Sequence, residues 1–243
     1  MTVLLLQLSG PLQSWGDSSR FTRRMTRREP TKSGVVGLLA SALGRSREES
    51  VADLAQLELG VRSDQPGTIV RDFQSEKSLD GKKIMPLTHR YYLADAKFLV
   101  ALGGNGELLH RLDAAVKAPR WPLYLGRRSC PPDTPLSLGV HEEYVTVREA
   151  LEEEPWIASE WYRRKHGVVP TLEVSYDARD GEPCVSQADY PLDFSLRERR
   201  YACRPVFRCS IPNPDLAEDS QVTTVNGSAA FVADDSTDPL SIV

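Results

Sequence analysis

Hydrophobic positions along the chain come in short blocks whose spacing predicts alternating strands and helices. Residues 3–8 are almost continuously apolar and end at a Ser-Gly-Pro turn, which predicts a buried strand. Apolar residues then recur at helical spacing over residues 36–43. We expect Thr31 or Ser33 to cap this helix and Gly44 to end it. The start of the chain therefore predicts a buried strand followed by a short helix.

The pattern continues with a second strand, a long insertion, a third strand, a second helix and a fourth strand. The insertion is polar and rich in turn residues, and a stretch of that length between strands is usually a functional loop or an extended hairpin. The order β-α-β-insertion-β-α-β is typical of a ferredoxin-like fold, which is also that of the RNA recognition motif. The segments are strand 57–61, insertion 64–88, strand 91–102, a helix between Asn105 and Pro119, and strand 121–125.

The pattern of apolar and charged residues changes after Pro131 and Pro132. A charged helical segment over residues 147–166 is broken at Pro155, and strand-like segments follow before a polar end. That end is rich in acids, Ser and Thr, which predicts a flexible tail. We therefore predict an α+β protein. Its parts are a ferredoxin-like domain over residues 1–135 with an insertion at about 64–90, a smaller, partly β subdomain over 136–211, and an acidic flexible tail over 212–243.

Charge is distributed unevenly along the chain. The net charge of −4 and the pI of about 5.7 give no overall sign of nucleic-acid binding. Residues 1–47, however, hold eight Lys or Arg against two acids, whereas residues 211–243 hold six acids and no Lys or Arg. This asymmetry predicts a basic functional surface near the start and a solvated acidic end.

Cysteine usage and the N-terminus indicate a cytoplasmic protein. The four cysteines form no C-x-x-C pair, which argues against a zinc site, and reduced thiols are the natural interpretation. The start lacks a basic region of the kind that opens a signal peptide, and no apolar run approaches the roughly 18 residues that span a bilayer. We expect no cofactor, no metal and no membrane partner.

An arginine-rich segment over residues 20–28 is the first candidate for binding chemistry. Arginine suits phosphate because its planar guanidinium makes bidentate hydrogen bonds. Clustered arginine with few acids nearby is the electrostatic footprint of nucleic-acid binding, although a solvated loop face would look the same. Not all five can contact one strand, so some are expected to face a protein partner. The members are Arg20, Arg23, Arg24, Arg27 and Arg28.

Two neighbouring features add to this candidate. Thr31, Lys32 and Ser33 open a helix, where free backbone N–H groups, hydroxyls and an ammonium form an anion site, or where the hydroxyls serve only as caps. The spacing is not that of a Walker A loop, so ATP binding is not predicted. Trp15, next to Gly16, is either a stacking surface for RNA or a core tryptophan that anchors its loop.

Further candidates lie in and after the insertion. Its polar side chains either bind RNA or belong to a solvated loop. Tyr91 and Tyr92 alternate on the strand that follows, so at most one faces RNA while the other packs inward. Arg127 and Arg128 follow a glycine and are placed to hold phosphate. The candidates in the insertion and at its exit are Arg71, Gln74, His89, Arg90 and Tyr91.

Four segments within roughly the first 135 residues form a series of motifs. The segments are Gly10-Pro11-Leu12-Gln13-Ser14-Trp15-Gly16, Pro30-Thr31-Lys32-Ser33-Gly34 through Gly37-Leu38-Leu39, Arg90-Tyr91-Tyr92-Leu93-Ala94-Asp95-Ala96-Lys97-Phe98 and Tyr124-Leu125-Gly126-Arg127-Arg128-Ser129-Cys130-Pro131-Pro132. Taken together and in this order, they resemble CRISPR-associated protein family five, and its type I-E branch most of all.

The resemblance implies a specific role. It implies that the insertion is a β-hairpin thumb that grips the 5′ handle of a guide RNA within a Cascade surveillance complex. The implied partners are the guide RNA, the Cascade backbone subunit and the large subunit, with target DNA reached only through the complex. On this interpretation the chain is an RNA-binding subunit and not an enzyme.

Two alternatives remain open at this point. The first is a metal-independent endoribonuclease that processes precursor guide RNA, with His89, Lys32 and Tyr91 or Tyr92 around a 2′-hydroxyl. In the type I-E arrangement a separate subunit does this processing, and sequence spacing does not test the required geometry. The second alternative, a free RNA-recognition module, is disfavoured by the acidic remainder of the chain.

Overall fold

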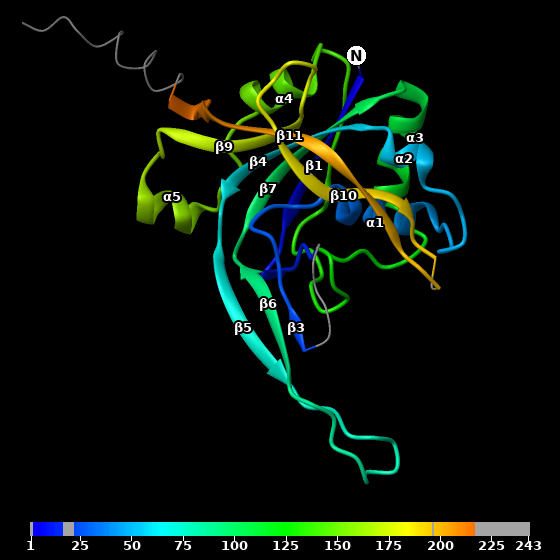
Figure 1. The fold of residues 1–243 in the computed structure, drawn as a ribbon. Helices are drawn as coiled ribbons and strands as arrows, with labels where there is room; N and C mark the ends of the chain where they lie inside the picture. The colour runs from blue at the N-terminus through cyan, green and yellow to red at the C-terminus, as the bar shows by residue number, and fades with distance from the viewer. Residues whose placement is uncertain (1, 17–21, 196, 217–243) are drawn as a thin grey trace, which may run out of the picture.

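A computed structural model describes residues 2–16, 22–195 and 197–216. A large antiparallel sheet forms the body of the molecule, and its seven strands run in the order β10-β11-β9-β4-β7-β1-β8 (Figure 1). This arrangement confirms the predicted α+β class. The bounds are β1 Thr2–Ser9, β4 Glu58–Gln65, β7 Lys97–Gly104, β8 Ser137–His141, β9 Thr171–Asp177, β10 Val185–Asp193 and β11 Arg200–Pro212.

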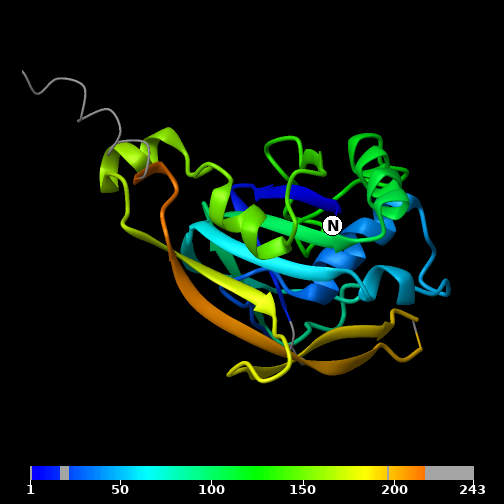
Figure 2. The ribbon, with the colours of Figure 1, turned by 90° about the horizontal axis from the view of Figure 1, so that it is seen from above.

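The central strands are buried on both faces, which explains the continuous apolar run at the start of the chain. Side chains alternate along β1, so that Leu4, Leu6 and Leu8 pack toward α1 and α3, whereas Val3 and Leu5 pack toward α4. Figure 2 shows the sheet between these helix layers, with β10 and β11 curling beside α1. The helices are α1 Lys32–Leu43, α2 Ala52–Ala55, α3 Gly106–Lys117, α4 Val147–Glu153 and α5 Glu160–His166.

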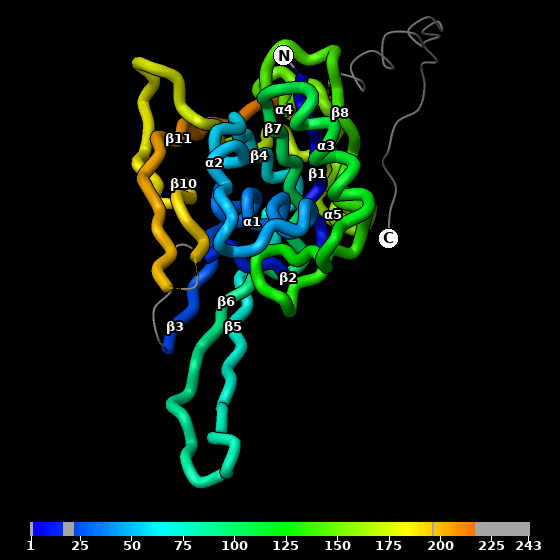
Figure 3. The backbone as a smooth tube through the Cα atoms, turned by 90° about the vertical axis from the view of Figure 1, so that its right-hand side faces the viewer, coloured from blue at the N-terminus to red at the C-terminus, as the bar shows by residue number. Residues whose placement is uncertain are grey.

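A second, smaller sheet carries a hairpin that projects far from the body (Figures 1 and 3). Strands β5, Thr68–Gln74, and β6, Thr88–Ala94, pair along their whole length. Two short strands, β2 at Leu12–Gln13 and β3 at Arg23–Arg24, also pair with β6. The insertion is therefore an extended hairpin, one of the two forms expected of it.

Most predicted boundaries match the structure. Thr31 caps α1 by accepting a hydrogen bond from the backbone N–H of Gly34 at 3.2 Å, and Gly44 ends this helix with φ of 75°. Asn105 caps α3, and the interruption of helical structure at Pro155 separates α4 from α5. Local signals of caps and breakers were therefore sufficient at these positions.

Two predicted elements were wrong. The single strand expected over residues 91–102 is two strands, because Asp95 turns the chain with φ of 56°. The strand expected over 121–125 is an irregular loop in which the Leu125 N–H bonds to the carbonyl of Cys130 at 2.7 Å, and Pro122 has no N–H for a ladder. The fourth strand of the predicted series is instead β8, and it pairs with β1.

β10 is a strand that the sequence pattern does not reveal, because its polar residues point inward and its apolar residues point outward. Its polar residues Gln187 and Asp189 are buried, while Val185 and Leu192 are exposed. The domain boundary predicted at residue 135 stays a prediction. Strand β9, which follows that boundary in sequence, pairs with β4 and so extends the same sheet. Of the predicted tail, residues 212–216 contact the body, and the rest lies outside the described residues. Among the helices of the described residues, none has the length and apolar character needed to cross a membrane.

Candidate nucleic-acid interface

Strand register places aromatic and basic side chains on one face of the projecting hairpin. Arg71 on β5 is directly opposite Tyr91 on β6, and Phe73 is opposite His89. On the other side of β6, Arg23 of β3 is the register partner of His89. Directly paired residues point to the same side of a sheet, so these five side chains share a face. We call it the hairpin face.

The hairpin face has the composition of a single-strand binding surface. Arg23 and Arg71 are exposed, Phe73 is 67% exposed, and His89 and Tyr91 are half-buried. In the described residues no carboxylate forms an ion pair with Arg23 or Arg71. Exposed aromatics stack on bases of any sequence, and free arginines bind the backbone phosphates between them. The register thus brings together four of the predicted residues and adds Phe73, which sequence reasoning had not singled out as a site residue.

Side chains on the opposite side of the hairpin make more contacts within the chain than those of the hairpin face. Arg24 and Arg90 are register partners there, and the Arg90 guanidinium lies 3.6 Å from the carboxylate of Glu76. Gln74 is half-buried opposite Thr88. Tyr92, only 4% exposed, packs inward as expected for one of the two adjacent tyrosines.

Arg127 has a structural role instead of the expected phosphate contact. Its guanidinium donates to the backbone carbonyls of Tyr91 at 3.1 Å and Arg24 at 2.9 Å, and it lies 4.8 Å from the ring centroid of Tyr92. These contacts join the loop after residue 125 to β3 and β6. Arg127 therefore supports the root of the hairpin, while Arg128 is exposed and lines a pocket described below.

The start of α1 is an anion site, as its sequence predicts, but a carboxylate of the chain itself occupies it. The Lys32 backbone N–H donates to Asp189 at 2.8 Å, and the Lys32 ammonium lies 2.7 Å from Asp177. Arg204 bridges the two carboxylates, at 2.7 Å from Asp189 and 2.5 Å from Asp177. The expected contact of Lys32 with an RNA phosphate is corrected accordingly: its charge is buried and already paired. We call these four residues, with Gln187, the buried ion network.

The electrostatics of this network favour the charged form of Asp189. Burial alone would raise the pKa of this carboxyl, but hydrogen bonds and charge from Arg204, with donors on Lys32 and Gln187, outweigh burial and hold the pKa below its usual value. The Gln187 amide donates to Asp189 at 2.7 Å. The network thus ties β10 and β11 to the start of α1.

Trp15 is a core tryptophan, the second of the two interpretations that the sequence left open. It is 1% exposed, and its indole N–H donates to the side chain of Gln13 at 3.0 Å. A Cβ atom on Gly34 would lie 2.7 Å from the indole ring, so glycine is needed there for close packing. The expected stacking of Trp15 on RNA is corrected, because too little of its ring is open to solvent.

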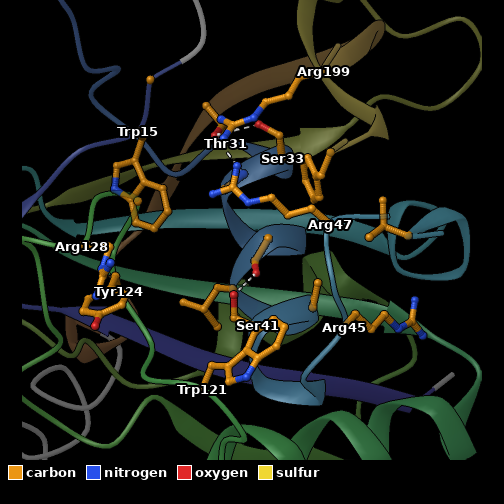
Figure 4. Close-up of a pocket in the computed structure, with 18 of the residues that line it drawn as sticks. Trp15, Thr31, Ser33, Ser41, Arg45, Arg47, Trp121, Tyr124, Arg128 and Arg199 are labelled. Atoms are coloured by element: carbon orange, nitrogen blue, oxygen red, sulfur yellow. Dashed lines mark hydrogen bonds between the residues drawn. The ribbon is translucent and has the colours of Figure 1, made fainter. Parts of the chain in front are cut away.

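A pocket of about 600 Å³ lies along α1, between the loop that precedes residue 128 and the turn that joins β10 to β11 (Figure 4). Aromatic and basic side chains surround it, and among the described residues that line it none is acidic. Ser33, another predicted site residue, lines it as well. Its aromatic residues are Trp121, Tyr124, Phe194 and Tyr201, beside the edge of Trp15, and its basic residues are Arg45, Arg47, Arg128 and Arg199. We call it the α1 pocket.

Gly37 keeps one wall of the α1 pocket open. A glycine inside a helix costs about 1 kcal/mol relative to alanine. Packing does not explain it, because a Cβ atom there would meet only the ring of Phe194, at 3.9 Å, which is an ordinary contact. A glycine that the protein's own packing does not require, beside a basic and aromatic pocket, indicates close approach of a ligand.

The remaining predicted residues are placed as follows. Arg27 is half-buried and its guanidinium lies 3.4 Å from the Gln187 amide oxygen, so it joins the buried ion network. Arg28 is exposed. Arg20 lies outside the described residues. The sequence carries only weak signals for the α1 pocket, because its residues come from four separate segments; a glycine in the middle of a helix, Gly37, is the signal that could have indicated it.

The trio proposed for a ribonuclease is not available as a set. Lys32 is buried in its ion pair with Asp177, so it is not free to donate to a 2′-hydroxyl. The Nδ1 atom of His89 is buried without a hydrogen-bond partner in the described residues. Within those residues, no three His, Cys, Asp or Glu side chains gather in a way that would hold a metal ion.

Comparisons with known proteins identify relatives of this chain. The family model described as CRISPR-associated protein (Cas_Cas5) matches residues 3–207. The CRISPR system Cascade subunit CasD of Escherichia coli strain K12 is 33% identical, over 80% of this chain and 93% of that protein.

Two solved structures are similar throughout. A chain from a CRISPR RNA-guided surveillance complex is 31% identical with a TM-score of 0.72, covering 88% of this chain and 92% of its own length. A crystal structure of a Cas protein is 42% identical with a TM-score of 0.68, covering 87% and 95%. The similarity therefore extends over most of the chain and is not confined to one motif.

Proposed function

This chain belongs to the Cas5 family of CRISPR-associated proteins, and from that premise we propose that it is a non-catalytic subunit of a CRISPR Cascade complex. In this role it anchors the 5′ handle of the guide RNA. The observation that carries the proposal is the hairpin face, on which Arg23 and Arg71, unpaired with carboxylates of the described residues, lie beside the exposed ring of Phe73 and the half-buried ring of Tyr91. Such a face suits an unpaired RNA segment, whose bases stack while its phosphates are neutralised.

The α1 pocket supplies a second contact for the same RNA. Its volume of about 600 Å³, its aromatic walls and its arginines suit one or two unstacked nucleotides. Arg45 pairs with Asp53, so the arginines that remain for an anionic ligand are Arg47, Arg128 and Arg199, and no acidic side chain stands beside them among the lining residues that the structure describes. We assign the hairpin to the gripping element and the α1 pocket to the site where the handle is fixed.

The fold supports this assignment. In the body, β4, β7, β1 and β8 are neighbours in that order, with α1 and α3 packed on one face. This is the strand order of a ferredoxin-like unit, and we propose that the hairpin is a thumb inserted between its second and third strands. The unit and its thumb correspond to the RNA-binding part of the chain.

The tip of the hairpin suits a protein partner. Leu79, Ile84 and Leu87 are exposed there, and Phe73 lies on the hairpin face closer to its root. Exposed apolar side chains gathered at one end of a projecting element mark an interaction site. We assign this tip to the Cascade backbone subunit, with the large subunit on the body and target DNA reached through the assembled complex.

Neutralising the two arginines of the hairpin face tests the proposal. The Arg23→Gln/Arg71→Gln variant should bind handle RNA at least about 100-fold more weakly, because each lost charge-assisted contact is worth about 1.5–3 kcal/mol, which is tenfold or more for each arginine. The slope of log affinity against log salt should fall by about 1.4, or 0.7 for each phosphate on a single strand. Fluorescence anisotropy over a salt series measures both quantities.

The control variant is Arg111→Gln/Arg179→Gln, which removes the same charge from exposed positions far along the chain from the hairpin. It should leave the salt slope unchanged. If the two variants behave alike, the hairpin face does not bind RNA and the proposal fails.

The His89→Ala variant separates anchoring from cleavage. An anchoring subunit needs His89 only as a polar and stacking group, so guide-RNA 5′ ends should be unchanged in cells that keep their own processing subunit. Purified protein incubated with repeat RNA in EDTA should likewise leave the RNA intact. Loss of mature 5′ ends in cells expressing His89→Ala would replace the anchoring proposal by the ribonuclease alternative.

A further inference from the structure

Helix α5 presents a basic and aromatic face that the contacts described so far do not use. Trp161, Arg164 and Lys165 are spaced i, i+3, i+4, so they lie on one side of the helix. All three are exposed, Trp161 by 46%. No carboxylate in the described residues forms an ion pair with Arg164 or Lys165.

The other side of α5 is fixed firmly to the body. Tyr162 packs edge-on against Trp156, with ring centroids 6.2 Å apart. Arg163 lies between Trp156, at 4.7 Å from its ring, and Asp215, at 2.6 Å. His166 stacks on Tyr162 with centroids 4.4 Å apart. The outward side chains therefore stand on a rigid base.

A buried charge also holds the segment that leads into α5. Asp64 pairs with Arg62, and both are fully buried. One oxygen of the same carboxylate accepts from the backbone N–H of Ile157 at 2.8 Å. The side chain of Gln65 accepts from Ser159, the residue that precedes the helix, at 2.7 Å.

These contacts hold α5 in place, although a surface helix of seven residues would not be stable by itself. None of the α5 residues is buried, and so short a helix is not stable alone in water. Its position is therefore set by contacts at the end of β4, next to the place where the chain enters β5. Figure 1 shows α5 on the β9 side of the body, close to the root of the hairpin.

We propose that the outward face of α5 is a second RNA contact, which binds the guide RNA where it continues beyond the handle. The inference rests on the proposed function, since it takes the handle to be held at the hairpin face and the α1 pocket. Trp161 offers a stacking surface for one base, and Arg164 and Lys165 neutralise the flanking phosphates. A single-stranded RNA fits this combination because its bases are free to stack.

Two RNAs separate this contact from the handle site. The short RNA carries the handle alone, and the long RNA carries the handle followed by guide sequence. We expect Trp161→Ala/Arg164→Gln/Lys165→Gln to weaken binding of the long RNA by at least tenfold, with a salt slope lower by about 1.4. Binding of the short RNA should be unchanged. The Arg111→Gln/Arg179→Gln variant should bind both RNAs like the unmodified full chain.

Each other result overturns the proposal in a distinct way. If the long RNA binds the α5 variant normally, α5 is not an RNA contact, while the proposed function still stands. If both RNAs are weakened equally, α5 contributes to the handle site or to the fold, and thermal denaturation distinguishes the two. A single-stranded DNA of the same sequence is measured beside the two RNAs. If the α5 variant weakens the binding of this DNA alone, the partner is DNA. If the unmodified chain binds neither RNA, the proposed function itself fails.

Discussion

The Asp189→Ala variant is expected to lose about 3–5 kcal/mol of the free energy of unfolding, because it leaves two buried cations, Lys32 and Arg204, with one carboxylate between them. Asp189 is fully buried and accepts hydrogen bonds from Arg204 at 2.7 Å and from the Lys32 backbone at 2.8 Å. Without the carboxylate, β10 loses its hydrogen bond to the start of α1, and β11 keeps only the link through Arg204, Asp177 and Lys32. Urea denaturation followed by circular dichroism measures the loss.

The control for this variant is Asp193→Ala on the same strand. Asp193 lies 3.6 Å from Arg200 in a pair that is largely exposed, and such pairs contribute at most about 1 kcal/mol. Similar losses in the two variants would show that the buried ion network does not hold the sheet to the helix. The network also bears on function, because the turn between β10 and β11 carries Phe194 and Arg199 of the α1 pocket.

The same network predicts how stability depends on pH. The pKa of Asp189 is lowered in the folded protein relative to the usual value of 3.8. The stabilisation is therefore complete above that usual value and is lost as pH falls through the lower, folded-state pKa. Acidification below about pH 4 should destabilise the unmodified chain more steeply than the Asp189→Asn variant. Parallel slopes in the two proteins over that range would contradict the assignment.

Replacing Gly37 by leucine is expected to separate stability from RNA binding. Leucine is a better helix former than glycine by about 0.5–1 kcal/mol, and the neighbouring space at position 37 is open, so the melting temperature should not fall. The added side chain would fill the α1 pocket and displace a base. The loss of one stacked base is worth about 1–3 kcal/mol, so handle affinity should fall by roughly 5- to 150-fold.

A smaller substitution and a matched control sharpen this test. Gly37→Ala should bind handle RNA with an intermediate affinity, because its single methyl group fills less of the pocket. Ala114→Leu adds leucine to an exposed position of α3 and should leave binding unchanged. Normal handle affinity in a folded Gly37→Leu variant would show that the α1 pocket does not receive RNA.

The parts of the fold that depend on local signals were predictable from the sequence. Thr31, Asn105 and Gly44 set helix ends through their own side chain or backbone, and no distant residue is needed. The alternation of Tyr91 and Tyr92 also indicated correctly that one of the two packs inward, and the structure shows that it is Tyr92. The extended form of the insertion was one of two alternatives that its length permitted.

The parts that depend on contacts between distant segments were not predictable. The buried ion network joins Lys32 to Asp189, residues 157 positions apart, and nothing near Lys32 in sequence indicates that its charge is already paired. Arg127 looked like a phosphate ligand for the same reason, since its acceptors are carbonyls 36 and 103 positions away. The composition of a basic segment shows that cations are present but not which of them are paired within the fold.

The most direct test of the proposed anchoring role is photo-cross-linking of the guide RNA within the assembled complex. The complex is purified with a guide RNA that carries photoreactive uridine in its handle, and cross-linked peptides are identified by mass spectrometry. The account predicts cross-links at Phe73 or Tyr91 of the hairpin face and at Trp121 or Tyr124 of the α1 pocket, with the RNA uncleaved. Cross-links from the handle that fall only on other subunits, or only on surfaces of this chain outside those two sites, would contradict it.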